Sequence, residues 1–228
     1  THTMGKPCVM DTIMEVANKY GLFLFEDGCE SPGARYKGKL VGKYGHIITC
    51  SFYTAHIVVC GEGGMCSTDH DDLAYLLRST RSHGRKPGSN YFDHQRFGLN
   101  SKMNDLEAAL GLEGMANLDD TFRIRRANKE KLLVMLEDLS DKLCLWKEDP
   151  EIEYVSPHAF PMVLAVDNQD KRDEFYSYLE NNSIQCKTLF GSVPTQQKAF
   201  AFMGHQLGEF PEAEYVGRNG LHIGIHQY

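Results

Sequence analysis

The chain has 228 residues, of which 42 % are hydrophobic and 24 % charged, and its formal net charge is −7. These values are ordinary for a folded globular protein and exclude a disordered tail, a collagen-like fibre and a disulfide-dense miniprotein. The acidic balance disfavours a nucleic-acid partner, and the lack of an apolar run of about 18 residues disfavours a membrane span. The length predicts one large domain or two small ones.

Seven cysteines are scattered along the chain, with no Cys-x-x-Cys motif and no histidine–cysteine pair at zinc spacing. Most stand in apolar surroundings, which predicts reduced, buried thiols in a cytoplasmic protein. A metal or iron–sulfur site is the weaker alternative. The first residues have neither the basic nor the apolar region of a signal peptide, so these residues are not expected to be one.

The first half of the chain predicts a helix followed by a buried strand, which is half of a βαβ unit. The helix is expected over residues 10–20, with Asp11 able to cap its start and Gly21 ending it. Residues 22–25 form a continuous apolar run, typical of a buried parallel strand. The next elements expected are a loop or small hairpin at 34–40, strands at 46–52 and 57–60, a tight glycine turn at 61–64, a helix at 69–80 capped by Thr68 or Asp69, and a long irregular segment at 81–100.

The second half begins with two predicted helices, at 103–114 and 118–139, and the second of them holds the expected domain boundary. We therefore expect one domain at residues 1–130 and another at 131–228. A small α+β unit should follow, with strands at 143–146, 160–166 and 184–188, a helix at 171–181 and a last strand near residue 220. The first of these helices should carry one apolar face with Met103, Leu106, Ala109 and Leu110. The second should bury Phe122, Leu132, Leu136 and Leu139.

Two polar clusters stand at the ends of predicted strands, where open α/β sheets bind their ligands. Glu26 and Asp27 end the first strand, and a carboxylate there can pair with a ligand cation or a ring nitrogen; the alternative is that both only cap the next element. Ser51 and His56 lie at the edge of the next strand. A hydroxyl can hold a phosphate and an imidazole can transfer protons near neutral pH, although a lone histidine beside apolar residues is more often structural.

Five strings carry these clusters in a fixed order: LFEDGCESPGARYKGKLVG (24–42), SFYTAH (51–56), GEGGM (61–65), RSHG (81–84) and GLNSKMNDLEAA (98–109). Together they resemble the DegT/DnrJ/EryC1/StrS family of pyridoxal-phosphate (PLP) sugar aminotransferases. The resemblance covers most of residues 1–140 and, more loosely, the remainder. It implies an α/β fold of the PLP-dependent transferase (aspartate aminotransferase, fold type I) architecture, here a truncated large domain with a mainly parallel sheet and a small α+β carboxyl-terminal domain.

The resemblance also implies roles for single residues. Asp27 is expected to pair with the pyridine nitrogen of PLP and so keep the ring an electron sink, with Glu30 beside it in the cofactor site. Ser51 is expected to hold the cofactor phosphate. Asn100 is expected to reach the phosphate site of a neighbouring subunit, because these enzymes look like homodimers with shared active sites, and this would make residues 81–100 an interface element.

One departure from the family pattern decides the predicted chemistry. The family's Schiff-base lysine belongs five residues after the serine, where this chain has His56, and imidazole has no primary amine to condense with an aldehyde. A branch of the family with histidine at this place consists of sugar 3-dehydratases, in which the histidine takes a proton from the cofactor C4′ carbon and the 3-hydroxyl leaves. The resemblance therefore predicts a 3-dehydratase that uses PLP or pyridoxamine phosphate (PMP), a nucleotide-linked 4-keto-6-deoxy sugar as substrate, and glutamate as amino donor.

Further expectations follow from the same resemblance, including a place in deoxysugar and lipopolysaccharide biosynthesis. Branch members with an iron–sulfur cluster hold it with closely spaced cysteines after the Arg-x-x-Gly segment, but this chain has none between Cys66 and Cys144. We therefore expect no cluster, and favour the GDP-sugar type. Family members are longer, so the chain is expected to be a fragment. The alternatives are a sugar aminotransferase that uses another lysine, such as Lys43 or Lys102, and an inactive truncated paralogue.

Overall fold

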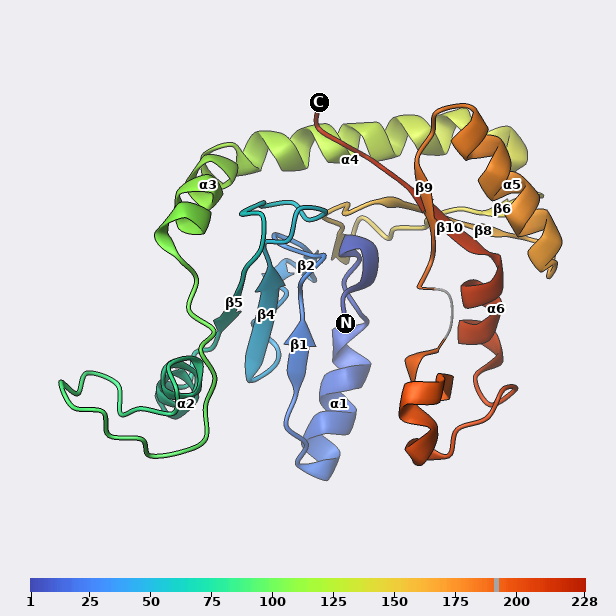
Figure 1. Ribbon diagram of the computed structural model, residues 1–228. Coiled ribbons are helices and arrows are strands. Elements are labelled where there is room, and N and C mark those ends of the chain that lie inside the picture. Colours follow the sequence, from blue (N-terminus) through green and yellow to red (C-terminus); the bar gives the residue numbers. More distant parts are fainter. Residues whose placement is uncertain (191–192) are drawn as a thin grey trace. The chain divides into compact units, whose positions relative to one another are not determined.

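A computed structural model describes residues 1–190 and 193–228 of the chain (Figure 1). The described residues form two compact units: Thr1–Arg123 with Glu148–His158, and Ile124–Lys147 with Ala159–Tyr228. The division into domains at residue 130 stays a prediction. No helix among the described residues is long and apolar enough to cross a membrane.

The first unit is built on a three-stranded sheet in the order β1-β4-β5, whose strands stand side by side in Figure 1. The strands are β1 (Phe25–Asp27), β4 (Ile47–Ser51) and β5 (Gly64–Ser67); β1 runs parallel to β4, and β5 runs antiparallel to it. The predicted parallel strand thus exists, but it starts later than expected, and the apolar residues Leu22, Phe23 and Phe25 are each about half exposed. The packed core of this unit includes Ala34, Val41 and Ile48.

Helix α1 (Met10–Tyr20) has the predicted bounds and ends at Gly21, whose φ of 61° is left-handed. The expectation that Asp11 caps this helix is wrong, because the residue at the cap position is Val9 and no side chain caps it. The Asp11 carboxylate instead forms an ion pair with Lys37.

The predicted strand at 57–60 is wrong, although Ile57, Val58 and Cys60 are buried as their apolar character predicts. A short apolar run shows burial but not backbone pairing. The chain turns through the glycines after residue 60, and the strand partner of β4 begins only at Gly64. The turn is held by a hydrogen bond from the Phe52 N–H to the Gly63 carbonyl at 3.0 Å.

Of the loop or small hairpin expected at 34–40, the structure has the hairpin, formed by β2 (Arg35–Tyr36) and β3 (Lys39–Leu40). A third strand of that sheet, β7 (Glu153–Tyr154), comes from far along the chain and had no sequence signal. Helix α2 (Asp71–Arg81) confirms the helix expected at 69–80, but its cap position is His70 and no side chain caps it, so the expected caps Thr68 and Asp69 are wrong. Residues 82–100 contain isolated bridges but no helix or strand, which confirms the irregular segment expected there.

The two long predicted helices are present as α3 (Asp105–Ala116) and α4 (Leu118–Met135), and α4 runs from the first unit into the second. A capping box joins Asn104 and Glu107 at the start of α3. On the predicted apolar face of this helix, Leu106 and Leu110 are exposed among the described residues. The expected positions on the second helix, Phe122, Leu132, Leu136 and Leu139, are half-buried.

The second unit is an antiparallel sheet in the order β6-β8-β10-β9. Its elements are β6 (Leu143–Cys144), β8 (Phe160–Leu164), α5 (Gln169–Asn181), β9 (Cys186–Thr188), α6 (Pro211–Asn219) and β10 (Gly220–Ile223). The predicted α+β unit is therefore confirmed, although α6 and the two short 3₁₀ helices at Pro194–Gln196 and Lys198–Met203 were not predicted. Its core consists of Leu143, Phe160, Met162, Leu164, Leu179, Cys186, Leu221 and Ile225.

The seven cysteines are all free thiols. Cys60 and Cys186 are buried, as expected, but Cys66 and Cys144 are exposed, so the prediction of buried thiols is wrong for these two. Both stand on strands, where alternate side chains point to opposite faces and an apolar neighbour does not ensure burial.

Candidate active site

The candidate site lies at the carboxyl ends of β1 and β4 in the first unit. The parallel register sets Asp27 opposite Thr49, so Asp27 and Ser51 end up at the same edge of the sheet. The turn that follows β4 carries His56 back toward this edge, and its N–H donates to the Tyr53 carbonyl at 2.9 Å. The carboxyl edge of parallel strands is where open α/β sheets collect ligand-binding groups.

Asp27 is held as a charged acceptor. Its Oδ1 accepts the Cys29 N–H at 3.1 Å, and its Oδ2 accepts the Thr1 hydroxyl at 3.4 Å. Burial acts to raise the pKa of this carboxyl, but the hydrogen bonds from Cys29 outweigh it, and the pKa lies below its usual value. Asp27 is therefore ionised at neutral pH and can accept a proton-bearing nitrogen of a ligand.

The His56 imidazole is held as a neutral base. Its Nδ1 is buried and has no hydrogen-bond partner among the residues that the structure describes. Burial lowers the pKa of the ring, and the backbone of Cys29 and the charge of Asp27 offset this only in part. A neutral imidazole with a free lone pair can take a proton at pH 7.

Glu30 and His158 complete the site, and sequence reasoning missed the second of them. Glu30 Oε2 accepts the Met4 N–H at 2.6 Å, and Oε1 lies 3.8 Å from His158 Nε2. Burial raises the pKa of Glu30, and the charge of Asp27 adds to this effect. The His158 ring centroid is 4.9 Å from that of His56, with the rings tilted by 40°.

The other two predicted residues are placed differently. Ser51 Oγ accepts the Tyr53 N–H at 3.2 Å and stands at the carboxyl end of β4. Asn100 is exposed, and its Oδ1 accepts from Lys102 Nζ at 2.5 Å. The structure thus brings Asp27, Glu30 and His56 together with Ser51 on the same strand edge, whereas none of the contacts described for Asn100 joins it to that group. Its reach into a neighbouring subunit stays a prediction.

Glu26, next to Asp27, builds the scaffold of the site. Its Oε2 accepts the Gly42 N–H at 2.7 Å and faces His2 Nε2 at 3.0 Å, and its Oε1 accepts the N–H groups of Tyr44 (3.0 Å) and Gly45. The His2 Nδ1 accepts a backbone N–H, so its Nε2 carries the proton donated to Glu26. Glu26 therefore anchors the loop before β4 rather than capping the next element along the chain.

Charged and polar side chains at the carboxyl ends of strands in a mixed sheet are typical of α/β proteins that bind small molecules there. The model of the DegT/DnrJ/EryC1/StrS aminotransferase family matches residues 1–228, and the chain belongs to this family. Solved structures of the same fold contain PLP or PMP.

Three comparisons describe how similar the chain is to known members. It is 30 % identical to the dTDP-4-dehydro-2,6-dideoxy-D-glucose 3-dehydratase of Saccharopolyspora spinosa, over 91 % of this chain and 50 % of the relative. It is 27 % identical to the GDP-4-keto-6-deoxy-D-mannose 3-dehydratase of Yersinia pseudotuberculosis, over 98 % of this chain and 61 % of that protein. The crystal structure of S. venezuelae DesV in complex with a ketimine intermediate matches with a TM-score of 0.89 at 29 % identity, over 100 % of this chain and 59 % of DesV. The chain thus spans between half and three-fifths of these relatives.

Proposed function

We propose that this chain is part of a PLP- or PMP-dependent 3-dehydratase that acts on a nucleotide-linked 4-keto-6-deoxy sugar. The observation that carries the proposal is His56: a buried imidazole with an unpartnered Nδ1 stands at the carboxyl edge of the sheet, where the family pattern has its Schiff-base lysine. Imidazole cannot condense with an aldehyde, but it can transfer a proton. The site is therefore suited to elimination of water rather than to amine transfer through a lysine.

The donor groups of the site fit a pyridoxal cofactor. Asp27 is an ionised carboxylate that can accept the protonated pyridine nitrogen, and the Ser51 hydroxyl can donate to a phosphate. When bound, the cofactor supplies an electron sink for the pair of electrons left by a departing proton. In this arrangement His56 removes that proton, and its lowered pKa keeps it neutral and ready at pH 7.

Two sequence relatives support the choice of substrate class. One is named a dTDP-sugar 3-dehydratase and the other a GDP-sugar 3-dehydratase. We favour a GDP-linked sugar, with glutamate as the amino donor that regenerates PMP, and a homodimer in which Asn100 serves the partner's site. A cytoplasmic location would follow from such a soluble substrate, and these points remain proposals for the whole protein.

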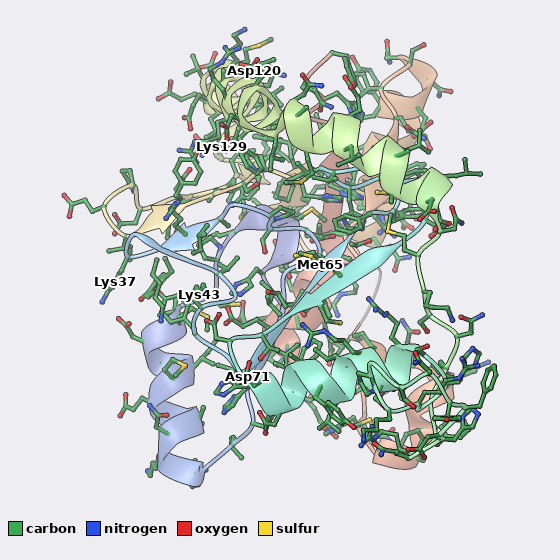
Figure 2. The ribbon with its side chains drawn as sticks, turned by 90° about the vertical axis from the view of Figure 1, so that its left-hand side faces the viewer. Lys37, Lys43, Met65, Asp71, Asp120 and Lys129 are labelled. Atoms are coloured by element: carbon green, nitrogen blue, oxygen red, sulfur yellow. The ribbon has the colours of Figure 1, made fainter. Side chains whose placement is uncertain are left out.

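The second candidate is a sugar aminotransferase that uses a different lysine. Lys43 is a poor choice, because it lies in the loop before β4 while the site lies beyond the other end of that strand; Figure 2 shows Lys43 in this loop and Asp71 in the first turn of α2. Five residues of strand span about 16 Å, and Lys43 Nζ is already paired with Asp69 at 2.8 Å. Lys102 is better placed, because its neighbour Met103 packs near Gly63, in the turn that joins β4 to β5.

The two candidate functions differ in the product formed and in whether a lysine forms an adduct with the cofactor. The complete gene product, with PMP, glutamate and GDP-4-keto-6-deoxymannose, should yield a sugar that has lost one water, detected by mass spectrometry. His56→Asn should abolish this product, whereas His205→Asn, a histidine of the second unit paired with Glu209, should not. An amino sugar as product, together with a borohydride-stable cofactor adduct on Lys102, would instead establish the aminotransferase. Failure to bind cofactor at all would identify an inactive paralogue.

A further inference from the structure

Three titratable side chains meet at the site from three separate segments. Glu30 follows β1, His56 follows β4, and His158 follows β7. The two imidazole centroids are 4.9 Å apart, and Glu30 Oε1 lies 3.8 Å from His158 Nε2. The side chains of His158 and Glu30 are only 9 % and 14 % exposed. They form a row in the order carboxylate, imidazole, imidazole, which ends at the proposed base.

We propose that His158, supported by Glu30, is the proton partner of His56 in the dehydration, receiving the proton that His56 has taken. This inference rests on the proposed function and assigns a positioning role to a residue that the family motifs quoted above do not include. The step moves one proton: the protonated His56 returns to the neutral form as His158 becomes protonated, and no electrons are exchanged. The proton is then available for the hydroxide that leaves the sugar.

Electrostatics favours the positive charge on His158 over His56. Two imidazoles this close in a buried site are not both doubly protonated, because two positive charges at that distance repel strongly. The Glu30 carboxylate adjoins His158 directly and stabilises a proton there. At 4.9 Å between centroids, a modest rotation of either ring brings a nitrogen of each within hydrogen-bond distance.

The other groups that face His56 do not compete for its proton. Tyr53 meets the ring edge-on, with centroids 6.1 Å apart. The charge of Asp27 acts to raise the pKa of His56, but the pKa of Asp27 itself lies below its usual value, so this carboxylate stays ionised and does not take the proton. The pKa of the Cys29 thiol is raised to about 11, which makes it a poor acid in the working range. His158 is thus the group that receives the proton from His56.

The test uses the complete gene product with ¹⁵N-labelled histidine, whose ring signals report protonation directly. Wild-type His56 should titrate in two coupled steps more than about one pH unit apart. His158→Asn should reduce them to one step. Glu30→Gln keeps an acceptor for the Met4 N–H, and should lower the pH of the step shared by the two histidines, because the carboxylate no longer stabilises the charge. The matched control, His205→Asn, should leave the His56 titration unchanged.

A kinetic measurement separates this role from mere packing. His158→Asn should lower kcat by about 100-fold, the low end of what positioned acid–base groups contribute, with little change in KM and with one limb of the pH–rate profile removed. A His56 titration that is the same in wild type, His158→Asn and Glu30→Gln would overturn the inference. If the protein produces an amino sugar instead, the proposed function fails, and the titrations still show whether the two histidines are coupled.

Discussion

Replacing Glu26 by glutamine should destabilise the first unit more than replacing any exposed charged residue of that unit. Four donors converge on the two carboxylate oxygens: the N–H groups of Gly42, Tyr44 and Gly45, and His2 Nε2. Glutamine has one oxygen, so its NH₂ group must face two of these donors. Each buried donor without an acceptor costs about 1–3 kcal/mol, which gives a loss of about 2–6 kcal/mol. This is a large fraction of a typical free energy of unfolding.

The loss should depend on pH, and its sign follows from the pKa of Glu26. Burial acts to raise this pKa, but the hydrogen bonds from His2, Gly42 and Gly45 outweigh it, so the pKa of the folded protein lies below the usual 4.5. A carboxyl with a lowered pKa stabilises the folded state above its unfolded value, and this gain disappears as the pH falls through the folded value. The difference between wild type and Glu26→Gln should therefore be full at pH 7 and shrink below about pH 4.5.

Urea unfolding of the complete gene product, followed at pH 7 and at pH 4, measures both effects. With a slope of about 2 kcal/mol per molar urea, a loss of about 4 kcal/mol lowers the midpoint by about 2 M. Asp69→Asn is the matched control, because this exposed carboxylate pairs with Lys43 in the same unit and should contribute less than about 1 kcal/mol. Equal midpoint shifts for the two variants would refute the reasoning.

Three other outcomes follow from the packing. Gly5→Ala should lower the free energy of unfolding in urea by about 3 kcal/mol or more, because Gly5 has φ +85° and a Cβ there would lie 1.7 Å from the Ser156 carbonyl oxygen. The control Gly38→Ala has φ +75° and open space around it, so it should cost only about 1–2 kcal/mol. Equal costs for the two variants would contradict the predicted clash at Gly5. Leu221→Ala removes a fully buried core side chain of the second unit and should cost about 2–5 kcal/mol, with a loss under about 1 kcal/mol counting against the core assignment. Iodoacetamide at pH 8 should alkylate Cys29, whose pKa is raised to about 11, far more slowly than the exposed Cys66. Peptide mass spectrometry measures both rates. Equal rates would show that the pKa of the Cys29 thiol is not raised.

Local patterns predicted the elements whose backbone is set by nearby residues. The helix at 10–20 ends at a glycine, and the small hairpin at 34–40 closes within seven residues, so both were found. The strand predicted at 57–60 failed for the opposite reason. Ile57 and Val58 are buried, and Val58 lies beside Gly114 of α3, whereas pairing with β4 is decided by the turn at residues 61–63. Strand β7 has two residues and pairs with β2, which lies over a hundred positions away in the sequence, so no local pattern can predict it.

The same distinction separates the site residues that were found from those that were missed. Asp27, Ser51 and His56 occupy motif positions close in sequence, so a resemblance could single them out. His158 reaches the site only because residues 148–158 fold with the first unit, and no other residue of the site lies near it in the sequence. Glu26 was singled out, but its actual partners lie sixteen to nineteen residues downstream and at residue 2, so its scaffold role required the structure.

The strand directions give the strongest physical reason to regard His56 as the base. Because β1 and β4 are parallel, their carboxyl ends share one edge, and at that edge Asp27 is the ionised carboxylate that we propose pairs with a ring nitrogen. A base for the same ligand has to follow β4, not precede it, and this requirement rules against Lys43 before any reactivity is considered. His56 follows β4, is neutral at pH 7 and has a buried unpartnered nitrogen. A lysine in its place would offer an amine; an imidazole offers only a proton-transfer site, and that difference separates elimination from transamination on one scaffold.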